Sequence, residues 1–127
     1  MFQGIHHIAI ICSDYSRSKQ FYSEILGLTI VAEHYRAERH SYKLDLALAD
    51  GRQIELFSFV GAPLRPSYPE AQGLRHLAFS VENIDQAIGH LAQHQIAVEP
   101  VRVDPYTQKR FSFFHDPDGL PLELYEQ

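Results

Sequence analysis

Two histidines and two glutamates stand at matching positions in the two halves of the chain. His7 precedes Glu55 by 48 positions, and His76 precedes Glu123 by 47 positions. Imidazole and carboxylate groups bind divalent metal ions, and both also act as acids and bases. The repeated His and Glu pair therefore indicates a metal site, with proton transfer as the chemistry that such a site could support.

The neighbours of these residues predict that all four side chains lie on one kind of strand face. Because side chains alternate across a strand, Ile8 and Ile10 lie on one face and His7 on the other, and residues 76–81 repeat this pattern. In QIELF and in PLELY a single glutamate, Glu55 or Glu123, stands between two apolar residues. Each His and each Glu therefore projects away from the apolar core.

A carboxylate on a largely apolar strand costs several kcal/mol, on the order of the penalties for buried ions, unless it is paired or bound to a cation. One divalent ion bound by two glutamates and two imidazoles would offset this cost. The alternative is that each glutamate forms an ion pair at a sheet edge and that each histidine is an ordinary core residue. That alternative would win for any one of these residues, but the duplication favours the metal.

The two halves of the chain have the same predicted order of elements, βαβββ. This repeat predicts an α+β fold of two tandem βαβββ modules. Each module opens with an apolar strand that leads into a helix, capped at Asp14 or Ser16 in the first and at Asn83 or Asp85 in the second. The first helix is expected to end at Gly27. Strands are expected at about 28–35, 41–49 and 53–59, and then at about 96–103, 110–115 and 121–125.

The whole chain, 1–127, is expected to be one domain. Its first module covers about 1–60 and its second about 74–127, and the linker of about 61–73 contains three prolines and could act as a lid. A single βαβββ module covers one face of its sheet with a helix and leaves the other open. Two modules must therefore pair, within the chain or between chains.

Composition narrows the class of protein. A formal net charge of −5 argues against nucleic acid as a partner, because such binders rely on clustered Lys and Arg. No apolar run approaches the length that spans a membrane, and the N-terminal residues do not resemble a signal peptide, so we expect a cytoplasmic protein with no membrane partner. The one cysteine, Cys12, is expected to be a small core residue.

Several segments resemble the vicinal oxygen chelate superfamily, which has the glyoxalase/bleomycin resistance/dihydroxybiphenyl dioxygenase-like fold. These segments are HHIAIICSD, SKQFYSEILGL, QIEL, GLRHLAFSVENID and DPDGLPLELYE, and together they are most similar to the YaeR-type branch of glyoxalase-like proteins. The resemblance implies that His7, Glu55, His76 and Glu123 are the metal ligands, as in bacterial glyoxalase I. Family epimerases usually have Gln at the position of Glu55, and extradiol dioxygenases and fosfomycin enzymes typically use three protein ligands.

The resemblance implies a lyase or isomerase, similar to lactoylglutathione lyase. A divalent metal would stabilise the enediolate of a small carbonyl substrate such as a hemithioacetal, with Glu123 as the catalytic base and Glu55 as the second candidate. Ni²⁺ is favoured as the ion, with Zn²⁺ next and Co²⁺, Mn²⁺ or Fe²⁺ as alternatives. A homodimer with metal sites shared between chains is implied as well. Other readings are an epimerase, an iron-dependent dioxygenase, or a protein that binds or sequesters a small molecule without turnover.

The chain departs from glyoxalase I where that enzyme places an Arg and an Asn that reach glutathione, because Ile11 and Phe59 stand at those positions. We expect Phe57 and Phe59 to line the substrate pocket on the side of Glu55. Further pocket candidates are Tyr106, Lys109 and Arg110, and an anionic substrate would suit these residues together with the arginines at positions 36, 39, 65 and 102. Solvated surface charge is the alternative explanation for all of them.

Overall fold

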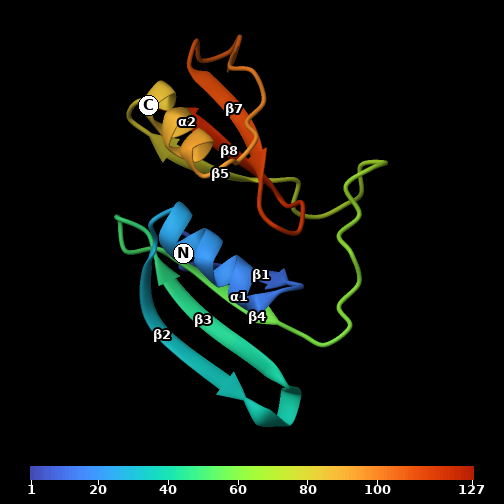
Figure 1. Cartoon of the computed structure of the whole chain (residues 1–127). Helices are drawn as coiled ribbons and strands as arrows, with labels where there is room; N and C mark the ends of the chain where they lie inside the picture. Colours follow the sequence, from blue (N-terminus) through green and yellow to red (C-terminus); the bar gives the residue numbers. More distant parts are fainter. The chain divides into compact units, whose positions relative to one another are not determined.

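The computed structural model describes all residues from Met1 to Gln127 and divides into two compact units, Met1–Leu64 and Arg65–Gln127. The boundary between the units falls inside the segment 61–73 that the sequence predicts as a linker. That segment contains no helix or strand and runs as an extended coil (Figure 1). None of the helices is long and apolar enough to cross a membrane.

The first unit is a four-stranded sheet with one helical segment on one face. Its elements are β1 (His7–Cys12), α1 (Tyr15–Gln20), the π-helix η1 (Phe21–Ile25), β2 (Thr29–Arg36), the 3₁₀ turn η2 (Ala37–Arg39), β3 (Ser41–Ala47) and β4 (Gln53–Ser58). The strand order is β1-β4-β3-β2, with β1 parallel to β4 and the other pairs antiparallel. The order βαβββ is the one that the sequence predicts.

The second unit repeats this arrangement with shorter edge structure. Its elements are β5 (Leu77–Val81), α2 (Ile84–Gln93), β6 (Arg102–Val103), β7 (Arg110–His115) and β8 (Pro121–Glu126). The strand order is β5-β8-β7-β6, and β5 is again parallel to β8. In both units the first strand therefore lies at one edge of a mixed sheet with the last strand beside it, which confirms the predicted α+β fold.

Local signals in the sequence explain the ends of the helices. Asp14 and Asn83 accept hydrogen bonds from the backbone N–H groups three residues later, of Arg17 and Gln86, and thereby cap α1 and α2. Gly27 has φ of +77°, and the N–H of the next residue, Leu28, reaches back to Tyr22 O at 3.0 Å. This left-handed turn ends the first helical segment at the glycine that the sequence predicts.

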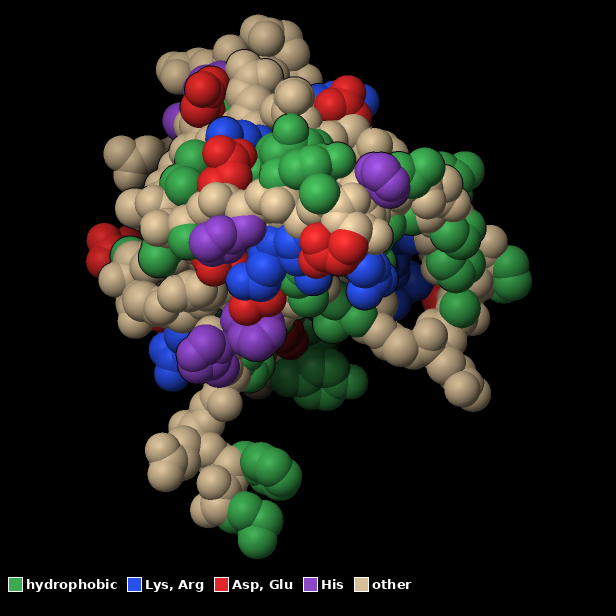
Figure 2. Space-filling model, turned by 90° about the horizontal axis from the view of Figure 1, so that it is seen from below, with side chains coloured by type: hydrophobic (Ala, Val, Ile, Leu, Met, Phe, Trp, Pro, Cys, Tyr) green, Lys and Arg blue, Asp and Glu red, His purple; other side chains and the backbone are tan.

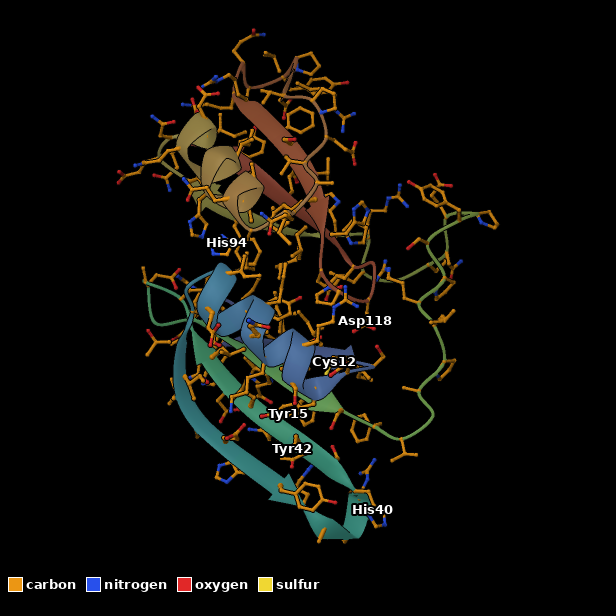
Figure 3. All side chains as sticks on the ribbon, in the orientation of Figure 1. Cys12, Tyr15, His40, Tyr42, His94 and Asp118 are labelled. Carbon is orange, nitrogen blue, oxygen red and sulfur yellow. The ribbon has the colours of Figure 1, made fainter.

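The helix side of each sheet forms the core. In the first unit, Tyr15 of α1 stacks on Tyr42 of β3 with 4.2 Å between the ring centroids, and Figure 3 shows both between the helix and the sheet. Cys12 is 1% exposed and is a core residue, as predicted. The large buried apolar side chains are Ile10, Phe21, Tyr22, Leu28, Leu44, Leu46, Ile54 and Leu56 in the first unit and Ile84, Leu91, Phe114, Leu120, Leu122 and Leu124 in the second.

One strand differs from the prediction. The run 96–103 forms a strand only at its last two residues, because Pro100 has no N–H to donate to a neighbouring strand. The segment still lies beside β7, since Glu99 N donates to Phe113 O at 2.9 Å and Ser112 Oγ donates to Glu99 O at 2.5 Å. The proline therefore breaks the hydrogen-bond ladder without moving the chain away from the sheet.

Candidate functional site

The first His and Glu pair lies on the face of the sheet that α1 leaves open. Glu55 in β4 is opposite Ala9 in the neighbouring parallel strand β1, and His7 lies two residues before Ala9 on the same face. His7 Nε2 is 3.4 Å from Glu55 Oε2, with the histidine side chain 41% exposed and the glutamate 15%. The small side chain of Ala9 leaves room for the longer imidazole and carboxylate to meet above it.

The second pair reproduces this geometry residue for residue. Glu123 in β8 is opposite Ala78 in β5, and His76 again lies two residues before the alanine. His76 Nε2 is 2.9 Å from Glu123 Oε2, and Glu123 is buried, with 8% of its surface exposed. The two units thus present the same pair of ligand types, with the histidine at the start of β1 or directly before β5 and the glutamate in β4 or β8.

The distances within both pairs suit ligands of one metal ion. Two donor atoms that each lie about 2.1 Å from an ion are separated by about 3.0 Å at an angle of 90° and by about 3.4 Å at the tetrahedral angle. The observed separations of 3.4 Å and 2.9 Å lie at these two values. In both pairs the atoms that approach are Nε2 and a carboxylate oxygen, which are the atoms that bind divalent ions.

Each unit supplies two potential ligands, and no group of three or more His, Cys, Asp or Glu that could hold a metal ion forms. A pair alone is too small for the coordination shell of a transition ion, which needs about four ligands or open positions filled by water. The four residues predicted from the sequence are thus brought together two by two.

Two charged residues of β3, Asp45 and Lys43, lie next to Glu55. Asp45 in β3 is directly opposite Glu55, and Lys43 Nζ lies 2.7 Å from Asp45 Oδ1 and 3.8 Å from Glu55 Oε1. Neither residue was predicted from the sequence as part of the site. The signal was present, because Leu44 and Leu46 flank Asp45 just as two apolar residues flank Glu55.

His6 contacts the first pair from the other side of the imidazole ring. His6 Nδ1 lies 2.9 Å from His7 Nδ1, and the two rings are nearly perpendicular. His6 precedes the first residue of β1, so the alternation of a strand does not govern it. A contact to Nδ1 fixes the ring so that Nε2 faces Glu55, which is the role that outer partners of metal-bound histidines have.

Aromatic residues take the corresponding places in the second unit. Phe113 in β7 is opposite Glu123, where the first unit has Asp45, and its ring meets that of His76 edge to face at 5.1 Å. Arg102 of β6 stacks on this ring and on Phe111, at 5.5 Å and 5.0 Å. The residue opposite Glu123 is therefore apolar, whereas the residue opposite Glu55 is charged.

The pocket residues predicted from the sequence separate into two groups. Phe57 follows Glu55 by two residues on the same face, and its ring stacks parallel to that of Phe59 with 5.9 Å between centroids. Tyr106 is 95% exposed in the turn after β6, and Lys109 lies in the same turn. In the space-filling view, basic side chains lie beside acidic and histidine side chains on the face shown (Figure 2).

Arg110 belongs to the opposite, helix-covered face. Its guanidinium binds Glu126 at 2.8 Å and Asp85 at 3.1 Å. The hydrogen bonds that Arg110 donates to Glu126 raise the pKa of Arg110, and the Ile84 N–H together with Arg110 lowers the pKa of Glu126. Arg110 therefore joins β7 and β8 to the start of α2, and it takes no part in the group around Glu123.

Comparison with known proteins places these features in one family. Residues 4–124 match the model of the Glyoxalase/Bleomycin resistance protein/Dioxygenase superfamily. "Uncharacterized protein YaeR" of Escherichia coli is 64% identical over 97% of this chain and 95% of its own length, and "Uncharacterized protein YwkD" of Bacillus subtilis is 58% identical over 100% and 99%. The crystal structure of a glyoxalase family protein from Enterococcus faecalis is 51% identical, with a TM-score of 0.92 over 98% of both chains.

More distant relatives carry the names of enzymes. These are 2-epi-5-epi-valiolone epimerase of an Actinomyces species, 26% identical over 95% of this chain and 78% of its own, and metallothiol transferase FosB of Staphylococcus saprophyticus, 28% identical over 98% and 78%. Two solved enzymes share the fold at lower identity. They are FosX of Listeria monocytogenes with Mn(II) (20%, TM-score 0.78, 100% and 94% covered) and maize glyoxalase I (16%, TM-score 0.82, 97% and 45% covered).

Proposed function

We propose, since the chain belongs to the Glyoxalase/Bleomycin resistance protein/Dioxygenase superfamily, that it is a metal-dependent lyase or isomerase that acts on a small carbonyl compound in the manner of glyoxalase I. The observation that supports this most is the repeated pair of His Nε2 and Glu Oε2 atoms at 3.4 Å and 2.9 Å. His7 and Glu55 would hold the ion together with His76 and Glu123. The bound ion would supply Lewis-acid polarisation of the substrate carbonyl.

Glu123 is the proposed catalytic base, and Glu55 is the second candidate. Lys43 lies 3.8 Å from Glu55 and restrains that carboxylate, whereas His76 is the one ion-pair partner of Glu123. Glu123 is also largely shielded from water, with 8% of its surface exposed. Such a carboxylate can take a proton from the carbon next to the carbonyl and return it to the neighbouring carbon.

Similarity to bacterial glyoxalase I supports further proposals about the assembly, the metal ion and the substrate. A homodimer in which His7 and Glu55 of one chain meet His76 and Glu123 of the other would complete two four-ligand sites. Ni²⁺ is the preferred ion, with Zn²⁺ second, and the cytoplasm is the proposed compartment. Glutathione is not the preferred thiol of the substrate, because Ile11, which is 54% exposed on the open face, cannot bind a carboxylate as an arginine does.

Turnover assays on metal-loaded protein test this function. Hemithioacetals made from several thiols serve as substrates, and a 2-hydroxy ketone that can change configuration tests the epimerase alternative, which the 26% identical epimerase favours. Glu123→Gln is expected to abolish turnover with an unchanged circular dichroism spectrum, while Glu82→Gln, at an exposed position, keeps it. Full activity of Glu123→Gln would rule out the proposed base, and a wild-type protein that binds metal without any turnover would favour sequestration.

A further inference from the structure

Two arginines and two phenylalanines form a cluster beside the first His and Glu pair. The guanidinium of Arg36 lies 5.1 Å from the centre of the Phe57 ring and 5.9 Å from that of Phe59. Arg39 lies 5.1 Å above Phe59. Because the two rings are stacked in parallel, they form a flat support that holds both guanidinium groups. We refer to these four residues as the arginine shelf.

The positive charges of the arginine shelf have no partner within the protein. Neither Arg36 nor Arg39 forms an ion pair, and Arg39 makes only its contact with Phe59. Arg36 donates one hydrogen bond, from Nη2 to the buried Ser41 Oγ at 3.2 Å. Its Nε is buried and has no hydrogen-bond partner, which is unusual for a donor that carries charge.

Other cations on the open faces of the two sheets are neutralised by acidic residues. Lys43 lies 2.7 Å from Asp45, and Arg102, which stacks on two phenylalanines in the second unit, lies 3.8 Å from Glu99. The chain has 16 acidic residues against 11 Lys and Arg, so carboxylates are not scarce. The two unpaired arginines, held together on this acidic protein, are therefore suited to bind an anion from outside the chain.

The arginine shelf lies next to Glu55 on the same face of one sheet. Phe57 is two residues beyond Glu55 in β4, a step of about 7 Å along a strand, and Lys43 is directly opposite Phe57. Arg36 ends β2 and Arg39 ends η2, so both lie at the connection between β2 and β3, where Figure 3 labels His40. A small molecule that reaches Glu55 with one end can therefore reach the arginines with the other.

We propose that Arg36 and Arg39 bind an anionic group of the substrate, a carboxylate or a phosphate, while the carbonyl end of the same molecule lies at Glu55. This inference rests on the proposed function for the role of Glu55. The planar guanidinium donates paired hydrogen bonds to either anion, and the stacked rings hold its edge outward and reduce the entropy lost on binding.

Anion binding to the metal-free, full-length protein tests this inference. Inorganic phosphate and succinate are the two probes, measured by titration calorimetry and by the NMR signal of the Arg36 Nε–H. Arg36→Gln and Arg39→Gln remove one shelf cation each, and Arg39→Gln keeps the contact of Arg36 with Ser41 if the first variant unfolds. Arg17→Gln is the matched control, because Arg17 is an exposed cation on α1, across the sheet from the shelf.

We expect one or both probes to bind and to shift the Arg36 Nε–H signal. Each shelf variant should weaken binding by about ten- to hundredfold, the usual effect of one charge-assisted hydrogen bond, and Arg17→Gln by less than about twofold. The probe that binds more tightly identifies the phosphate or the carboxylate class. No binding up to about 20 mM, or an equal loss in Arg17→Gln, would overturn the inference.

Metal binding, measured separately by adding Zn²⁺ or Ni²⁺ to the same protein, keeps this result separate from the proposed function. A chain that binds metal through the two His and Glu pairs but no anion would refute the arginine shelf alone. A chain that binds the anion at Arg36 but no metal would refute the proposed function alone.

Discussion

Replacing Glu123 by Gln should weaken metal binding far more than the loss of one surface charge. Gln keeps the shape of the side chain but removes the charge from a carboxylate that is 8% exposed and lies 2.9 Å from His76 Nε2. Loss of one partner from a buried ionic contact costs about 3–5 kcal/mol, which corresponds to roughly 150- to 5000-fold in dissociation constant. The low exposure of Glu123 places the effect in this range and not in that of a surface pair.

The assay is a competition between the protein and a chromophoric chelator for Zn²⁺ and for Ni²⁺. Glu82→Gln makes the same chemical change at an exposed position and should alter affinity by less than about threefold. Circular dichroism verifies that both variants are folded. If folded Glu123→Gln binds both ions within threefold of the wild type, Glu123 is not a ligand and the ligand set is wrong.

Three further predictions concern the support of the site and the fold. His6→Ala should weaken metal binding by about 10- to 100-fold, since it removes the contact that orients His7; unchanged affinity in the same chelator assay would contradict this role. Leu56→Ala should destabilise the fold by about 2–5 kcal/mol, because Leu56 is 0% exposed, whereas Leu64→Ala at 89% exposure should leave urea unfolding nearly unchanged; similar losses for both would refute the assigned core. The folded pKa of Glu126 is lowered, so its contribution to stability is present above the unfolded pKa of about 4.3 and is lost as pH falls through the folded pKa. In urea unfolding, the wild type should therefore lose more stability than Glu126→Gln as the pH is lowered from 5 to about 3. Equal losses in the two proteins would contradict the stabilising contacts of Glu126 with Ile84 and Arg110.

The sequence was sufficient to predict features that depend on local alternation and capping. The faces of β1 and β4, the pairing of each His with a Glu, and the end of the first helix at Gly27 all follow from patterns of a few residues. Because the pattern repeats in the second half, each prediction in one module supported the same prediction in the other. Pro100 is also evident in the sequence. Its effect on the strand, however, depends on which neighbouring strand would have accepted a hydrogen bond at that position.

Features that depend on the register between distant strands could not be predicted in the same way. Arg36 meets Phe57 only because β2, β3 and β4 align as they do, and no local pattern encodes this contact. For Arg110, alternation in β7 does predict that it lies on the other face from Phe111. Its ion pairs with Asp85 and Glu126, which hold it on the helix-covered face, join distant segments and could not be predicted. His6 lies outside the strand, so its turn toward His7 could not be read from alternation.

The claim that the two His and Glu pairs together bind one metal ion is tested most directly by anomalous diffraction. The data are collected at the absorption edge of zinc from crystals of the zinc-loaded protein. We predict one anomalous peak per site at about 2.0–2.2 Å from Nε2 of His7 and His76 and from a carboxylate oxygen of Glu55 and Glu123. Peaks only at other residues, or a peak bound by one pair while the other faces solvent, would contradict the account.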